Sequence, residues 1–373
     1  MISWRERRPF DFILLVAALA LCCYGLILIY SGSLASAGGK VDVLSGPIGR
    51  QAAFALVGLG LCLAFSRMDY RFLAQGSSGM YVGLILALLF VLILGTQGTF
   101  GSRRWIDIAG THVQPSEIGK LVVILVLAKY LSDNQENIKD LRVFLSSLLI
   151  AAAPALLVFA EPDLGSASIF LLVWLGMTIM AGCDVRHVIG SLGMLLALSP
   201  FALLVLVTDY QRERVSTFLD PARDALGSGF NTLQAEIGVG SGGWFGKGLT
   251  EGTQTQLDYL RTQTTDYVFS VLGEELGFIG AMILFALFII LLMRGLRAAS
   301  ISQDVFGQLI AVGVVIFILF QAFINIGVNI RLFPVTGIPL PFISQGGSSL
   351  IMMFIALGLL EGIVLRHKRL EFQ

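Results

Sequence analysis

Apolar runs of about 20 residues recur along almost the whole chain, and each is long enough for a helix to cross the hydrocarbon core of a membrane. Such runs are too long and continuous for barrel strands, and open strand edges cannot face lipid. Of the 373 residues, 56% are hydrophobic and 13% are charged, whereas roughly a quarter of a soluble domain is charged. The sequence therefore predicts an all-α polytopic membrane protein.

We expect ten transmembrane helices in a single domain that comprises residues 1–373. A large outer loop, 208–266, separates the seventh and eighth helices, and the cytoplasmic loops are too short for an ATPase or kinase module. The predicted spans are 11–31, 48–66, 80–95, 117–132, 143–160, 164–181, 187–207, 267–293, 305–328 and 347–365.

Basic residues gather at both ends of the chain and in alternate loops. They are Arg5, Arg7, Arg8, Arg67, Arg71, Lys139, Arg142, Arg186, Arg294, Arg297, Arg366, Lys368 and Arg369. The positive-inside rule places such segments in the cytoplasm. We therefore expect both termini in the cytoplasm and the 208–266 loop outside.

Glu117 and Lys120 open the fourth predicted span, directly after Pro115 and Ser116. Residues three apart lie on one face of a helix, so the carboxylate and the ammonium group can meet. Charged groups inside a membrane usually line a cavity or a pathway. We expect this role for both residues; the alternative is an ion pair that only neutralises itself.

Arg103 and Arg104 belong to an outer loop, against the positive-inside trend. A planar guanidinium group suits phosphate, so both are candidates for binding an anionic ligand. Anchoring at the interface beside Trp105 explains them equally well. Arg50, at the outer end of the second span, is a weaker candidate because its side chain can simply extend to the interface.

Two other outer connections hold candidate polar residues. The 331–349 connection is apolar and rich in proline, which predicts a re-entrant or interfacial stretch buried against protein. Its Ser344 and Ser348 either donate hydrogen bonds to a ligand or serve the fold alone. In the turn EPDLG, Asp163 is a second ligand candidate, although capping the sixth helix is the simpler role.

Asp266 precedes a long apolar helix in the stretch TQTTDYVF. An aspartate there can cap the helix, yet Thr264 and Thr265 offer the same service without a charge. Where a dry helix bundle meets water, the pKa of a carboxyl group rises, and the group can act as a general base. The residues alone leave base and cap open.

Glu274 and Glu275 follow Asp266 inside the same helix. Adjacent helical residues point about 100° apart, so the two carboxylates cannot share one site. We expect one of them to face a polar cavity, with Glu275 as the candidate, and the other to pair with a neighbouring helix.

Five stretches occur in one order and together resemble the SEDS family (shape, elongation, division and sporulation), bacterial membrane glycosyltransferases that polymerise peptidoglycan. The resemblance runs from about residue 10 to residue 366, and the element GTQTQL is more similar to the elongation member, RodA, than to the division member, FtsW. The stretches are GSRRWIDIAGTHVQPSEIGK, EPDLGSA, GGWFGKGLTEGTQTQLDYL, TDYVFSVLGEELGFIG and PVTGIPLPFISQGGSSL.

The resemblance implies polymerisation of lipid II into glycan strands in the bacterial inner membrane, with release of undecaprenyl pyrophosphate. It implies a partner, a class B penicillin-binding protein, and it implies Asp266 as the essential acid, with Glu117 and Lys120 lining a central cavity. Thr264 stands where the family usually has histidine. We expect a divalent cation, Mg²⁺ or Mn²⁺, to help the anionic leaving group, and neither a nucleotide nor a nucleic acid.

Two other functions stay open. A flippase or transporter for the same lipid shares the fold and the intramembrane charges, but a carrier needs charged groups near the bilayer midplane, whereas Asp266, Arg103 and Arg104 belong to the outer mouth. A non-catalytic scaffold for a cell-wall synthase is the other. Product formation in detergent, where transport is impossible, separates an enzyme from both.

Overall fold

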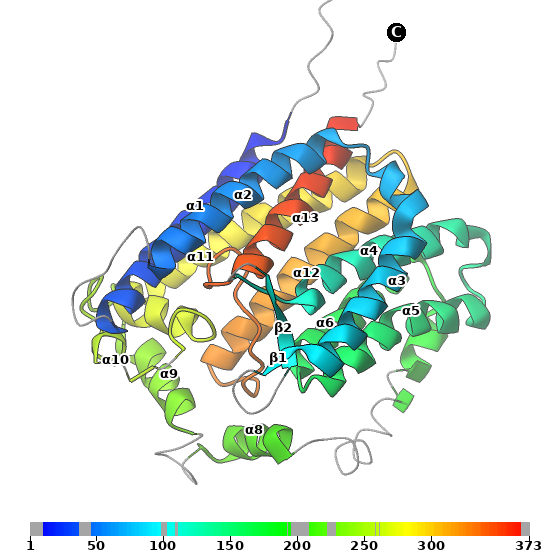
Figure 1. Cartoon of the computed structure of the whole chain (residues 1–373). Coiled ribbons are helices and arrows are strands. Elements are labelled where there is room, and N and C mark those ends of the chain that lie inside the picture. The colour runs from blue at the N-terminus through cyan, green and yellow to red at the C-terminus, as the bar shows by residue number, and fades with distance from the viewer. Residues whose placement is uncertain are drawn as a thin grey trace, which may run out of the picture.

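The structure is a computed structural model in which helices dominate (Figure 1). Eight helices in the described part of the chain are long and apolar enough to cross a membrane. They are α1 (Phe12–Ser36), α2 (Pro47–Arg67), α3 (Arg71–Leu94), α5 (Leu141–Ala160), α6 (Leu164–Ala181), α11 (Val268–Ile301), α12 (Val305–Asn329) and α13 (Gly347–Arg366). The structure describes residues 10–36, 46–97, 103–108, 111–191, 193–194, 209–221, 229–257, 259–260 and 262–366.

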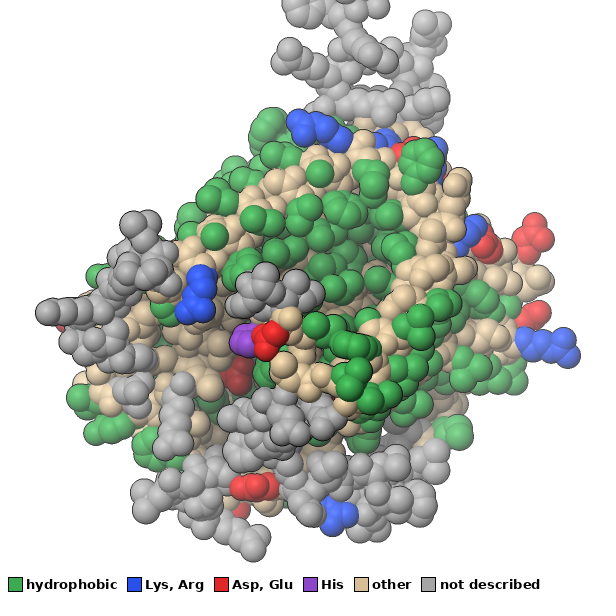
Figure 2. All heavy atoms as spheres, viewed as in Figure 1, with side chains coloured by type: hydrophobic (Ala, Val, Ile, Leu, Met, Phe, Trp, Pro, Cys, Tyr) green, Lys and Arg blue, Asp and Glu red, His purple; other side chains and the backbone are tan. Residues whose placement is uncertain are grey.

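Most predicted spans match a helix, with differences at the ends. The third helix begins at Arg71 rather than at residue 80, because the polar stretch before the apolar run is helical as well. The helix predicted for 267–293 continues to Ile301. The seventh predicted span, 187–207, lies largely outside the described residues. Hydrophobic side chains cover much of the face seen in Figure 2, as a lipid-facing surface requires.

α4 (Pro115–Asp133) is the fourth predicted helix and carries Glu117, Lys120, Lys129 and Asp133. These charges set it apart from the eight apolar helices, and most of its side chains are buried. It contacts α3, α5, α6, α12 and α13, so it lies inside the bundle. A short 3-10 helix, η2 (Gln135–Asn137), leads on toward α5.

The all-α prediction is wrong for the connection between α3 and α4. A three-stranded antiparallel sheet forms there from β1 (Thr96–Gln97), β2 (Arg103–Ile108) and β3 (Thr111–Val113). The order RRWIDI has no regular alternation of polar and apolar residues, so this short run carries no clear strand signal. The sheet lies toward the same end of the bundle as α8 and α9 (Figure 1).

The described part of the predicted 208–266 loop contains three helices of its own. They are α8 (Asp209–Leu219), α9 (Phe230–Ser241) and α10 (Thr253–Gln256). α9 packs against α11, and α10 packs against α1 and α9, so this part of the loop is folded onto the bundle.

α11 is broken at Gly277, which has φ 64° and ψ −159°. The glycine-rich segment 242–248 fills the break by pairing its backbone with that of the helix. The bonds run from the N–H groups of Lys247 and Gly248 to the carbonyls of Glu274 (2.9 Å) and Glu275 (3.1 Å), and from the N–H groups of Phe278 and Ile279 to the carbonyls of Gly243 (2.9 Å) and Trp244 (3.1 Å). Two carbonyls before the break and two N–H groups after it therefore have partners in an apolar setting.

The 331–349 connection is buried against protein, as predicted. Ile338, Leu340 and Ile343 are at most 2% exposed. Its backbone is satisfied from α12: Gln321 donates to the Pro339 carbonyl over 3.0 Å, and the Asn325 side chain donates to the Ile338 carbonyl over 2.8 Å. Side-chain amides thus replace the hydrogen bonds that the prolines prevent.

Candidate functional site

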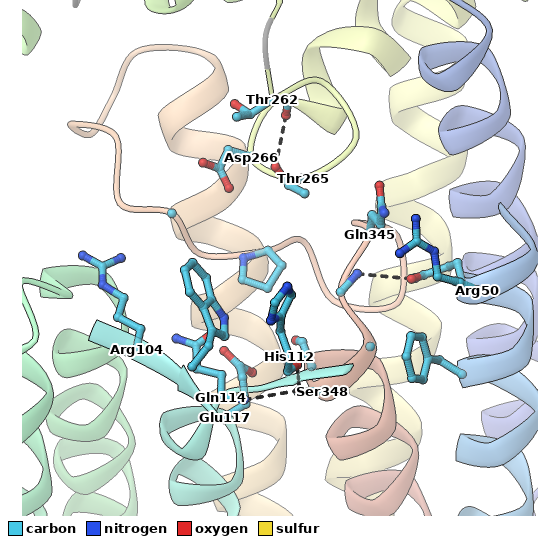
Figure 3. A pocket seen from close by; sticks show the side chains of 18 of the residues that line it. Arg50, Arg104, His112, Gln114, Glu117, Thr262, Thr265, Asp266, Gln345 and Ser348 are labelled. Atoms are coloured by element: carbon cyan, nitrogen blue, oxygen red, sulfur yellow. Dashed lines mark hydrogen bonds between the residues drawn. The ribbon is translucent and has the colours of Figure 1, made fainter. Parts of the chain in front are cut away.

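A cavity of about 760 Å³ opens between the sheet, α2, α8 and the loops that precede α11 and α13. Many polar side chains line it, and Figure 3 shows several of them pointing into one space. Its lining residues are Pro47, Arg50, Gln51, Phe54, Thr96, Arg104, Trp105, Asp107, His112, Gln114, Glu117, Arg214, Thr262, Thr265, Asp266, Gly337, Pro339, Gln345, Gly346, Gly347, Ser348 and Ser349.

Asp266 lines this cavity, and its backbone is held from two sides. Its N–H donates to the Thr262 carbonyl over 3.1 Å. Its own carbonyl accepts from the side-chain amides of Asn325 (3.2 Å) and Asn329 (2.9 Å) on α12. The main chain is therefore fixed independently of the side chain, and the carboxylate points into the cavity (Figure 3).

Asp266 is not the cap of α11. The N-cap position belongs to Tyr267, with no hydrogen bond from a capping side chain of its own. The backbone N–H of Ser270 in the first turn donates instead to Oδ1 of Asn329 over 2.9 Å. Because a neighbouring helix supplies this acceptor, the choice that the sequence left open is decided against capping.

The pKa of Asp266 is raised from 3.8 to about 6. Burial away from water is the main cause, and the nearby charge of Asp163 adds to it. Arg214 and Arg104 oppose the rise by favouring the ionised form. A carboxyl group with a pKa near 6 is largely ionised at neutral pH, yet it holds a proton more readily than an ordinary aspartate, which suits a general base.

Arg104 lines the cavity at the end of the sheet nearest the turn after α5. Its Nε donates to the carbonyl of Glu161 over 2.9 Å, and a terminal nitrogen donates to the carbonyl of Pro162 over 2.5 Å. Among the described residues no carboxylate bonds to this guanidinium group, although Asp266 and Glu161 are within electrostatic reach. Arg104 therefore carries positive charge into the cavity.

Two more arginines line the same space. Arg50 is an exposed residue in the first turn of α2, and Arg214 on α8 donates to the Val335 carbonyl over 2.9 Å. The sequence had indicated Arg50, but it missed Arg214, because nothing local distinguishes one arginine of a polar outer loop. Arg103 lies in β2, and its side chain is outside the described residues.

Glu117 and Lys120 form the predicted ion pair, with Lys120 Nζ 2.6 Å from Glu117 Oε1. Lys120 also donates to Gln321 Oε1 over 3.2 Å and lies 5.4 Å from the centroid of the Phe317 ring. Both side chains are buried, and only Glu117 lines the cavity. The prediction that Lys120 lines it is wrong: its ammonium group turns inward between α4 and α12.

Ser348 and Ser344 have different surroundings. Ser348 lines the cavity, where its hydroxyl donates to the His112 carbonyl over 3.1 Å. Ser344 does not line it, which favours the structural alternative that the sequence left open. The Ser344 hydroxyl donates to the Thr265 carbonyl over 2.6 Å and accepts from the Leu340 N–H over 2.8 Å. Its hydrogen bonds are thus used to hold the Asp266 loop.

Asp163 and Glu275 also lie outside the cavity wall. Asp163 caps α6, because its side chain accepts from the Ser166 N–H over 3.0 Å. Glu275 is fully buried on the face of α11 that meets α1, where its Oε1 accepts from the Ser31 hydroxyl over 2.5 Å. The cavity role predicted for Glu275 is therefore wrong. Asp163 acts on the cavity through its charge and through Gln114, whose side-chain amide donates to Asp163 Oδ2 over 3.3 Å.

Glu274 has other contacts than Glu275. Contrary to our prediction, it does not pair with a neighbouring membrane helix among the described residues. Its carboxylate is 2.8 Å from Lys247 Nζ and accepts from the backbone N–H groups of Gln254 (2.9 Å) and Thr255 (3.1 Å). It therefore holds the outer segment 247–256 against α11. The adjacent residues diverge around the helix as expected, but each serves the fold.

Sequence reasoning missed a row of amides along α12: Gln321, Asn325 and Asn329. They are four residues apart in an otherwise apolar helix, so they lie on one face. That face holds Lys120, the 338–339 backbone and the Asp266 carbonyl. The regular spacing of polar residues within a membrane helix was the available signal.

Among the described residues, no group of three or more His, Cys, Asp or Glu side chains is placed to hold a metal ion. The carboxylates that line the cavity are Asp107, Glu117 and Asp266. Glu117 is already paired with Lys120, and Asp107 with His112. The protein alone therefore offers single carboxylates rather than a closed metal site.

A family model that combines FtsW, RodA and SpoVE, described as "cell cycle protein", matches residues 12–369. The chain belongs to this family. It is 40% identical over 355 residues to stage V sporulation protein E of Bacillus subtilis, which covers 95% of this chain and 96% of that one. It is 36% identical over 370 residues to the probable peptidoglycan glycosyltransferase FtsW of Geobacter metallireducens, covering 98% of each.

Similarity extends to an elongation-type relative and to solved structures. Peptidoglycan glycosyltransferase MrdB of Escherichia coli is 35% identical over 360 residues, covering 96% of this chain and 94% of that one. The RodA crystal structure from Thermus thermophilus superposes with a TM-score of 0.69 at 28% identity, over 98% of this chain and 99% of that one. A chain from a peptidoglycan synthase complex, described as coordinating polymerization and crosslinking, gives 0.79 at 28% identity, over 95% and 97%.

Proposed function

We propose that this protein is a peptidoglycan glycosyltransferase that polymerises lipid II and releases undecaprenyl pyrophosphate. The observation that carries the proposal is the Asp266 carboxylate, which points into a polar cavity on a backbone fixed by Asn325 and Asn329. The family and the names of the relatives support the same activity.

In the proposed reaction, the C4 hydroxyl of an acceptor sugar attacks C1 of a donor glycan. The hydroxyl is a poor nucleophile, and Asp266 takes its proton as the new glycosidic bond forms. General base catalysis of this kind contributes roughly 10²–10⁴-fold to the rate. The raised pKa of Asp266, about 6, matches this task at neutral pH.

The bond that breaks joins C1 to the pyrophosphate, so negative charge develops on the leaving group. Arg50, Arg104 and Arg214 line the same cavity and are suited to that charge. The cleavage of this bond supplies the driving force, which agrees with a mechanism that uses no nucleotide. Lys120 is committed to Glu117 inside the bundle and does not take this role.

A divalent cation, Mg²⁺ or Mn²⁺, fits the proposal as a companion of the pyrophosphate. Mg²⁺ is usually held by one or two carboxylates together with substrate phosphates rather than by a protein cage. The phosphates of the substrate would supply most of the ligands, because Asp266 must stay free to take a proton and a closed site does not form from the described residues. The cation would neutralise charge on the leaving group.

The proposal includes the cellular setting. We place the ten predicted transmembrane helices in the bacterial inner membrane as one domain, with both termini in the cytoplasm and the cavity on the outer face. The relative found in a peptidoglycan synthase complex supports a class B penicillin-binding protein as the partner. The GTQTQL element supports a role in elongation.

The test is polymerisation of lipid II by purified protein in detergent, with glycan chains resolved on a gel. The wild type should make long chains, and Asp266→Asn should make none while it still binds lipid II. Asp266→Glu keeps the charge and should retain part of the activity. Chains of normal length from the Asn variant would refute the base assignment, and a wild type without product, with or without Mg²⁺, would favour a carrier or a scaffold.

A further inference from the structure

His112 and Asp107 form a second pair of ionisable side chains in the cavity. They are cross-strand partners in the β2–β3 hairpin, and Nδ1 of His112 is bonded to Oδ1 of Asp107. Both residues line the cavity that contains Asp266. The mechanism proposed above uses neither of them.

The residues around His112 orient its ring toward the cavity. Its backbone carbonyl accepts from the Ser348 hydroxyl over 3.1 Å, and its ring lies 6.4 Å from that of Trp105. Figure 3 shows the imidazole of His112 in the cavity, near Gln114 and Glu117 at the start of α4. Because Asp107 occupies Nδ1, the ring atom offered to a ligand is Nε2.

The contact between His112 and Asp107 contributes little to the stability of the fold. The side chains of His112 and Asp107 are 70% and 45% exposed, and ion pairs in water contribute roughly 0–1 kcal/mol. A ligand entering the cavity would displace that water and strengthen any contact with Nε2. A doubly protonated ring bonded to Asp107 presents Nε2 as an N–H donor, as a phosphate oxygen requires.

We propose that Nε2 of His112 donates a hydrogen bond to the phosphate of the lipid-linked sugar substrate, with Asp107 orienting the ring. The proposal rests on the proposed function for the identity of that substrate. His112 then adds a directed hydrogen-bond donor to the fixed positive charges of the arginines.

The other charged groups that line the cavity also act on a bound anion, so the test must separate them from His112. They are Arg50, Arg104, Asp107, Glu117, Arg214 and Asp266. Two substitutions do this. His112→Asn keeps an amide where Nδ1 meets Asp107 and removes Nε2, while His112→Gln places an amide N–H near the position of Nε2 that cannot titrate.

The experiment measures KM and kcat for lipid II in detergent, and the Kd for inorganic pyrophosphate by titration calorimetry. We expect His112→Asn to raise both KM and Kd about tenfold, the value of one hydrogen bond to a charged group, with kcat changed much less. His112→Gln should recover part of the affinity.

The outcomes distinguish this inference from the proposed function. If wild type polymerises lipid II and His112→Asn matches it in KM and Kd, the phosphate contact is wrong and the pair is a solvated surface feature. If wild type makes no glycan but the variant loses pyrophosphate affinity, the anion contact stands and the enzyme assignment fails. Thermal unfolding of each variant should stay close to wild type, which excludes a folding defect.

Discussion

Asn329 bonds to the backbone on both sides of the Tyr267 N-cap: its amide nitrogen donates to the Asp266 carbonyl over 2.9 Å, and its Oδ1 accepts from the Ser270 N–H over 2.9 Å. One side chain of α12 thus fixes the acid and starts the helix that follows it. Asn325 adds a second bond to the same carbonyl over 3.2 Å.

Replacing Asn329 with Ala should lower stability and activity together. The Ser270 N–H and hydroxyl lose their acceptor, and each buried group left unpaired costs about 1–3 kcal/mol. Thermal unfolding in detergent measures the loss. Asn137→Ala is the control, because Asn137 is exposed in η2, and exposed sites usually change stability by less than about 0.5 kcal/mol. Equal unfolding of the two variants would contradict the role of Asn329.

Breaking the Glu117–Lys120 pair should be costly, whereas removing both charges should not. Lys120→Met leaves Glu117 buried without a counter-charge, and one oxygen of that carboxylate already lacks a hydrogen-bond partner among the described residues. The expected loss is about 3–5 kcal/mol for either single change, and much of it should return in Glu117→Gln/Lys120→Met. Unfolding of the three variants measures this cycle. A double variant no more stable than the singles would show that the charges are not coupled.

Because of Asp266, the stability of the protein should fall and its activity should rise as the pH increases. Its native pKa, about 6, lies above the ordinary value of 3.8, so the folded state binds more protons between these values and loses stability as the pH rises through them. Activity needs the ionised form and should rise over the upper part of that window. Asp266→Asn should therefore be inactive yet more stable than wild type above about pH 6, with the difference vanishing below about pH 4.

Profiles of rate and unfolding temperature over this range check that prediction. A variant that is less stable than wild type at neutral pH would mean that the carboxylate is held by favourable contacts rather than exposed to a ligand.

Much of this architecture was predictable and the site was predictable in part. Length and hydropathy place the long helices, because a membrane helix must satisfy its backbone internally. The Glu117–Lys120 pair followed from spacing within one helix. Arg214, His112 and the amides of α12 did not, because their meeting depends on how distant segments pack.

Glu275 shows why the misassignments arose. A carboxylate in a membrane helix indicates a polar surrounding, but the sequence does not say whether that surrounding is a ligand cavity or a neighbouring helix. For Glu275 it is Ser31 of α1. For Ser344 it is the backbone of the Asp266 loop, which it holds without facing the cavity.

Gly246 should tolerate no side chain, in contrast to Gly240. Gly246 has φ 77°, and a Cβ there would lie 2.1 Å from the Glu275 carbonyl oxygen, whereas a Cβ on Gly240 meets nothing within 4 Å. Gly246→Ala should therefore reduce folded yield and unfolding temperature. Gly240→Ala, in helix α9, should be neutral or stabilise by up to about 1 kcal/mol. Detergent-extracted yield and thermal unfolding compare the two, and equal behaviour would contradict the close contact.

The interruption of α11 at Gly277 makes the glycine-rich outer segment a permanent part of the membrane bundle. Withdrawing that segment would bare the Glu274 and Glu275 carbonyls in a dry setting, at a cost of several kcal/mol for each. The glycine-rich segment is therefore a fixed part of the structure and does not open. Whatever moves to admit a lipid-borne sugar or to release a growing polymer must do so on another side of the cavity.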